Sequence, residues 1–234
     1  MRSSRRMVAC ALGICALATA PALAGPFDAP FTGTLDTEMV SMDLTGNVSG
    51  YPVTIRESPT LASLGQTVIA DDGGGGRMVA DSFFDVFVEL SVGPLSYPVN
   101  HHLMKLVPPG HPFPPPDFPP PNLPVPPVDP LPPPGGVYMG APGALYAPDF
   151  VLLAIRHEVG PVISRVPIPR GERETFNSTA ILAVQMVAGN RFGLPGGYNL
   201  LLNLTGPTTV DVTPEPGTLA LLSLGALALL RRRR

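Results

Sequence analysis

The chain has 234 residues with a net charge of −3, 32 prolines, two cysteines and no tryptophan. Arginines near the two ends hide a stronger charge, because residues 25–213 carry eight basic groups against seventeen acidic ones, a difference of −9. An acidic central region without a basic stripe argues against a protein that binds nucleic acid or anionic polymers.

Residues 1–24 have the three parts of a secretory signal peptide. The positive end consists of Arg2, Arg5 and Arg6. An apolar centre follows over residues 7–20. The small-residue cleavage signature consists of Ala22 and Ala24, followed by Gly25. We therefore expect an exported protein whose mature chain begins at residue 25.

Both cysteines, Cys10 and Cys15, lie inside this predicted signal peptide. The mature chain is then expected to contain no cysteine. Disulfides, thiolate nucleophiles and cysteine metal ligands are excluded for it on that basis.

Residues 25–107 are predicted to form a first β-rich half of the mature domain. Residues 34–45 alternate in polarity, although the inward face is ambiguous at Met39. Turn residues then lead to a partner strand over residues 51–57. Further strands are predicted at residues 66–70 and 77–92. In the last of these, one side is continuously apolar and should face the core. Its members are Phe84, Val86, Val88 and Leu90.

Residues 108–134 contain 16 of the prolines. Such a segment can form neither an α-helix nor a central strand, so it should adopt an extended polyproline II conformation. A linker or extended surface loop is the favoured interpretation, and a docking site for a partner is the alternative.

Residues 135–213 are predicted to form the second β-rich half. Its predicted strands cover residues 150–159, 162–168, 176–188 and 198–212. Residues 180–187 could form a helix, but their branched side chains favour a strand. The spacing predicts a mainly β fold, an antiparallel β-sandwich interrupted by the proline-rich segment. One sandwich is favoured over two small domains, whose separate cores would be marginal.

The four histidines are the first candidates for site chemistry. His101 and His102 are adjacent, so on a strand they point to opposite faces and cannot easily share a metal ion. With His111 and His157 they are expected to be solvated loop residues rather than ligands. No metal or other cofactor is predicted.

Three carboxylate pairs are further candidates. Asp71 and Asp72 precede a glycine run, which favours a plain turn over a calcium loop. The other two pairs are Asp81 with Asp85 and Glu172 with Glu174. They would serve a glycosidase only about 5–10 Å apart across a cleft, and exposed strand edges and loops explain them without chemistry. We therefore assign no catalytic residue and expect the protein not to be an enzyme.

Residues 214–234 form a distinct tail. It begins with Pro214, Glu215 and Pro216. The two prolines predict an extended, accessible peptide. Residues 217–230 carry no charge and would form a membrane helix of about 21 Å, shorter than a hydrocarbon core of about 30 Å. Four arginines, Arg231, Arg232, Arg233 and Arg234, end the chain and would act as a cytoplasmic membrane stop.

In order, spacing and terminal position, this tail resembles the PEP-CTERM sorting signal of bacterial secreted proteins. The resemblance implies recognition by an exosortase, a membrane-embedded transpeptidase-like enzyme, and cleavage near the Pro-Glu-Pro motif. The protein would pass through the inner membrane and then be released or transferred to the cell surface. A simple C-terminal membrane anchor is the alternative.

These observations favour an exported, non-catalytic surface or extracellular-matrix protein associated with exopolysaccharide. A carbohydrate-binding module is one alternative. Its stacking residues would have to come from Tyr51, Tyr97, Tyr138, Tyr146 and Tyr198. A secreted hydrolase with an unrecognised site is the second alternative.

Overall fold

A computed structural model of the chain describes residues 32–71, 73, 77–107, 113, 132–140, 144–146 and 148–214. The predicted signal peptide, most of the proline-rich segment and the tail from residue 215 lie outside these ranges. The strands are β1 (Gly33–Val48), β2 (Tyr51–Glu57), β3 (Ser63–Asp71), β4 (Arg77–Val92), β5 (Leu95–Ser96), β6 (Asn100–Val107), β7 (Val137–Gly140), β8 (Ala144–Tyr146), β9 (Phe150–Ile168), β10 (Gly171–Met186) and β11 (Asn199–Pro214). Within the described ranges, no helix is long and apolar enough to cross a membrane.

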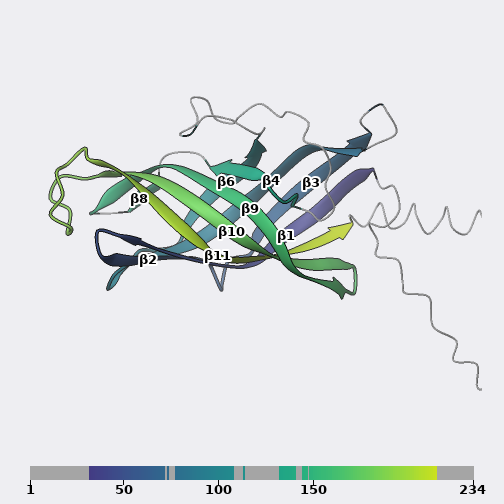
Figure 1. Cartoon of the computed structure of the whole chain (residues 1–234), viewed down its shortest axis with the longest axis horizontal. Helices are drawn as coiled ribbons and strands as arrows, with labels where there is room; N and C mark the ends of the chain where they lie inside the picture. Colours follow the sequence, from purple (N-terminus) through teal and green to yellow (C-terminus); the bar gives the residue numbers. More distant parts are fainter. Residues whose placement is uncertain are drawn as a thin grey trace, which may run out of the picture.

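All strands pair in antiparallel fashion within one sheet, which confirms the mainly β prediction (Figure 1). The order runs from β10 through β11, β1, β2, β4, β6 and β7 to β9, and β9 pairs again with β10. The sheet therefore closes on itself. The predicted division into two packed sheets is not confirmed. Closure pairs strand edges that an open sheet would expose.

Strands β2 and β3 together occupy one position in the closed sheet. Both pair with β1 and with β4, β2 along one part of these long strands and β3 along another. The chain between them leaves the ladder briefly, and Ser58 donates its backbone N–H to the carbonyl of Phe87 at 2.8 Å. A single interrupted strand thus joins β1 to β4.

A β-bulge in β1 resolves the ambiguity at Met39. The register with β11 shifts between Met39 and Ser41, and the burial pattern changes phase there. Leu35 and Met39 are buried before the bulge, and Met42 after it. An extra residue in one strand reverses the inward and outward positions, which strict alternation cannot accommodate.

Several strand predictions agree with the structure. The apolar side of β4 is buried, with Phe84 only 2 % exposed. Residues 180–186 belong to β10 and form a strand, as predicted. The two strands predicted at residues 150–159 and 162–168 are one continuous strand, β9. It is buried up to Val159 and mostly exposed beyond it.

The core unites strands from both sides of the proline-rich segment. One hydrophobic cluster extends from Leu35 to Val212. The end of the segment is fixed on β9, because Gly135 donates to the Val159 carbonyl at 2.6 Å and Val159 donates to Gly136 at 2.9 Å. Strands of the two predicted halves pair directly, β1 with β11 and β6 with β7. The predicted boundaries of the halves, residues 25–107 and 135–213, stay a prediction.

Candidate functional site

The end of β11 is the first region of interest, because the tail continues from it. Pro214 pairs in register with Leu35 of β1, so this strand end lies beside the start of β1. Pro214 is extended, as predicted, but it is buried rather than accessible. Proline has no backbone N–H to donate to a neighbouring strand, and at the end of a strand this removes few hydrogen bonds from the sheet. Glu215, Pro216 and Arg231–Arg234 lie outside the described residues.

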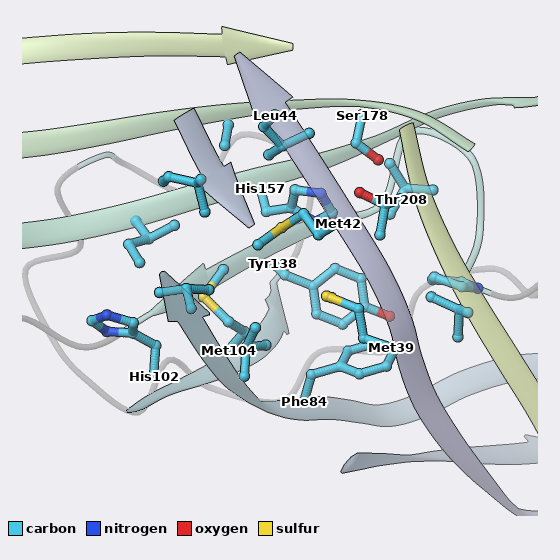
Figure 2. A pocket seen from close by; sticks show the side chains of 18 of the residues that line it. Met39, Met42, Leu44, Phe84, His102, Met104, Tyr138, His157, Ser178 and Thr208 are labelled. Carbon is cyan, nitrogen blue, oxygen red and sulfur yellow. The ribbon is translucent and has the colours of Figure 1, made fainter. Parts of the chain in front are cut away.

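A cavity lies inside the closed sheet (Figure 2). Its walls are mainly apolar and include Met39, Met42 and Met104. Its volume is about 40 Å³. Pro132, from the end of the proline-rich segment, also lines it. The fold therefore holds internal space that its own side chains do not fill.

Three polar side chains line this cavity from neighbouring strands: His157 on β9, Ser178 on β10 and Thr208 on β11. On β10, Ser178 lies between Ala180, which is opposite His157, and Phe176, which is opposite Thr208. His157, Ser178 and Thr208 therefore lie along a diagonal across the three strands. They are 7 %, 2 % and 2 % exposed, respectively. We call them the polar diagonal.

One atom of each residue in the polar diagonal lacks a hydrogen-bond partner. The His157 Nε2, Ser178 Oγ and Thr208 Oγ1 atoms are buried and have no partner among the described residues. Burial lowers the pKa of His157 to about 4, so its imidazole is neutral at physiological pH. A neutral imidazole and two hydroxyls can donate and accept hydrogen bonds, and here they meet an apolar space.

Other polar groups at the cavity wall are paired. The Tyr138 hydroxyl lies 2.8 Å from Ser82 Oγ, which lies 2.8 Å from Thr67 Oγ1. Burial raises the pKa of Tyr138, so its hydroxyl stays protonated. On another part of the wall, His102 Nε2 lies 3.1 Å from the Tyr146 hydroxyl. Burial, with a smaller contribution from His101, lowers the pKa of His102 to about 4.

The prediction that the histidines are solvated loop residues is wrong for His102 and His157. Both are buried in strands, β6 and β9. His101 does point to the opposite face from His102, as predicted, and its Nε2 lies 3.1 Å from Asp85 Oδ1. His111 lies outside the described residues. Among the residues that the structure describes, no three histidine, cysteine or acidic side chains gather as metal ligands.

The prediction of exposed carboxylates is wrong for Glu172 and Glu174. Both are buried and face the Arg165 guanidinium, whose Nε lies 3.3 Å from Glu172 Oε2 and 2.8 Å from Glu174 Oε1. The alternation of buried and exposed residues along β10 continues through Glu172 and Glu174. The composition of the chain alone could not show that these two side chains face inward. Their arrangement is that of a buried ion cluster.

The remaining carboxylates lie in simpler settings. Asp81 Oδ1 lies 3.9 Å from Lys105 Nζ, and Asp85 faces His101. Asp71 accepts the N–H of Gly73 at 2.7 Å, in keeping with the predicted turn. Asp72 lies outside the described residues.

Asp149 is a buried carboxylate that sequence analysis missed. It accepts bonds from the Tyr97 hydroxyl at 2.7 Å and from the Arg191 backbone N–H at 2.8 Å, and the Arg191 guanidinium also contacts it. Burial alone would raise the pKa of Asp149, but the bonds from Arg191 and Tyr97 lower it. This cluster fastens the segment between β10 and β11 to the start of β9. No motif in the sequence marks it.

The tyrosines give little support to a sugar-stacking surface. Tyr97, Tyr138 and Tyr146 are buried. Tyr51 and Tyr198 are 43 % and 49 % exposed. Only these two tyrosines could therefore stack against a sugar ring at the surface.

Comparison with protein families identifies one feature. The PEP-CTERM protein-sorting motif matches residues 212–234, which begin inside β11 and include the whole predicted tail. The match confirms the resemblance seen in the sequence, and it implies exosortase-dependent sorting of a secreted protein that passes through the membrane. A search of the curated proteins and of the solved structures finds no protein similar to this chain.

Proposed function

Since the chain carries a PEP-CTERM sorting signal, we propose that it is a non-catalytic protein of the cell surface or extracellular matrix. An exosortase cleaves it near Pro214, after residues 217–230 have held it transiently in the inner membrane. The mature domain then associates with exopolysaccharide.

The junction between the sheet and the sorting motif carries this proposal. Strand β11 is paired on both sides, with β10 and with β1, up to the start of the motif. Thr213 and Pro214 are the last residues in this ladder. Cleavage just beyond Pro214 would remove no strand, so the released domain keeps its closed sheet.

The placement of the acidic side chains supports a non-catalytic role. Glu172 and Glu174 share the Arg165 guanidinium. Asp149 is held by Arg191 and Tyr97. The bonds from Arg191 and Tyr97 lower the pKa of Asp149, whereas a general acid needs a raised pKa.

The test is the fate of Glu215→Ala in the native host, followed by intact mass and cell fractionation. In the wild type, we expect a mass that begins at Gly25 and ends near Pro214, in the surface or extracellular fraction. In the variant, we expect uncut protein in the membrane fraction.

Glu38→Ala is the matched control, because Glu38 is exposed on β1 and lies outside the motif. It should be processed like the wild type. A wild-type protein that keeps Arg231–Arg234 and stays in the membrane would make the tail an anchor and refute the proposal.

A further inference from the structure

We propose that the cavity inside the closed sheet is a binding site for a small, neutral, amphipathic molecule. Its hydroxyl or carbonyl oxygen would bond to the polar diagonal of His157, Ser178 and Thr208. Its apolar part would lie among the methionines of the wall. This inference is independent of how the protein is sorted.

The missing hydrogen bonds are the first argument. A buried polar atom without a partner costs about 1–3 kcal/mol, and native structures contain few of them. Here Ser178 Oγ, Thr208 Oγ1 and His157 Nε2 lack partners on three adjacent strands and line the same cavity. Three unpartnered polar atoms around one cavity indicate that a bound molecule supplies their hydrogen bonds.

The arrangement of the wall is the second argument. Small-molecule sites are typically apolar, with a few polar groups placed together. The polar diagonal supplies those groups, and Met39, Met42 and Met104 lie across the apolar part (Figure 2). Methionine side chains are flexible and polarisable, so they can adjust to an irregular apolar ligand.

The size of the cavity limits the ligand. The cavity, with a volume of about 40 Å³, is larger than the roughly 10–15 Å³ that a single water needs. Closed sheets of about eight strands have interiors that are filled by side chains or hold one small ligand. An unbranched alcohol or ketone of up to about six carbon atoms is the kind of ligand we propose for this space.

The charge of the site selects a neutral ligand. His102 and His157, the ionisable imidazoles at the wall, are both neutral, because burial lowers their pKa to about 4. An anionic ligand would therefore lose its hydration without gaining a cation. The phenols of Tyr138 and Tyr146 also stay protonated, because burial raises the pKa of each.

The test uses 1-hexanol and the protein as its own host exports it, grown with methionine labelled at the methyl carbon. We expect saturable shifts of the Met39, Met42 and Met104 methyl signals, with a Kd of about 1 mM or tighter. Met139 is an internal control, because it is buried in a separate cluster. Hexanoate at pH 7.5, which has the same number of carbon atoms, should bind at least about tenfold more weakly.

Two nearly isosteric substitutions test the polar diagonal. Thr208→Val should weaken hexanol binding about fivefold, and the double variant with Ser178→Ala about tenfold or more. The Kd of n-pentane, which makes no hydrogen bond, should stay the same. Thr205→Val, on the exposed face of β11, should leave both ligands unaffected.

The proposal is overturned if hexanol produces no saturable shift at the three methionines, or shifts Met139 equally. Equal hexanol affinity in wild type and Thr208→Val would also overturn it, because the polar diagonal would then bond no ligand. Thr208→Val is nearly isosteric, so this single variant remains informative even if the double variant does not fold.

Discussion

Two polar clusters differ in whether neighbouring residues supply their hydrogen bonds: one lies beside the start of β9, and the other lines the cavity inside the closed sheet. Around Asp149, a fully buried carboxylate receives bonds from Tyr97 and from the backbone and side chain of Arg191. On the polar diagonal, Ser178 and Thr208 are equally buried and receive none. Since an unbonded buried polar group is costly, the first cluster stabilises the fold and the second indicates a binding site.

Acid should destabilise the protein most strongly, through the two buried histidines. The pKa of His102 and of His157 is about 4 in the folded protein, below the ordinary histidine value of 6.5 that the unfolded chain should show. The unfolded chain therefore binds more protons between these values, and stability falls as the pH drops from 6.5 towards 4. Between pH 7 and pH 4.5 we expect a loss of about 2 kcal/mol for each histidine, measured by urea unfolding.

His157→Leu separates the two histidines. It should remove about half of this pH dependence and leave the contribution of His102, which is near Tyr146. An unchanged pH dependence in this variant would show that His157 is not the buried, neutral group that the structure describes.

The stability of the protein should be more sensitive to mutation in the Asp149 cluster, whose polar groups are hydrogen-bonded, than on the protein surface. Asp149→Ala leaves the Tyr97 hydroxyl and the Arg191 N–H without their acceptor, so we expect a loss of about 2–3 kcal/mol in the free energy of unfolding. Asp211→Ala is the matched control. Asp211 makes two bonds with Arg173 on the outer face, at 2.6 Å and 2.8 Å, and we expect a loss of about 1 kcal/mol there. Equal losses would remove the structural role assigned to Asp149.

The smallest effect should come from the polar diagonal itself. Thr208→Val removes a hydroxyl that has no partner, so stability without ligand should be unchanged or rise by up to about 1 kcal/mol. Ser82→Ala breaks the bonded chain with Thr67 and Tyr138 and should cost about 1–2 kcal/mol. Thermal unfolding of the two variants gives the comparison. A larger loss for Thr208→Val would mean that its hydroxyl already has a partner.

Local patterns predicted the strands well. The strands predicted at residues 51–57 and 77–92 match the observed bounds of β2 and β4. Ser49 and Gly50 adopt positive φ angles of 51° and 87°, so the predicted turn residues form the tight connection between β1 and β2. Alternation and turn chemistry act over a few residues, which is why the sequence reveals them.

Closure of the sheet could not be predicted in the same way. It depends on pairings such as Leu35 with Pro214, which lie near opposite ends of the described part of the chain. The bulge after Met39 also changes which residues face inward. Neither feature leaves a periodic signal, because strand partners are chosen by the packing of the whole core.

The candidate site was only partly visible in the sequence. His157 occupies the same phase of β9 as Ile155 and Val159, so its inward orientation could have been inferred from that alternation. Ser178 and Thr208 also lie at buried positions of their strands. That the three lack partners depends on distances across strands, which only the structure provides.

A high-resolution crystal structure of the protein, isolated as its host exports it, tests the central claim most directly. The account predicts electron density from a non-protein molecule within hydrogen-bond distance of His157 Nε2, Ser178 Oγ and Thr208 Oγ1. Side chains that turn to bond one another, with nothing else in the cavity, would contradict it.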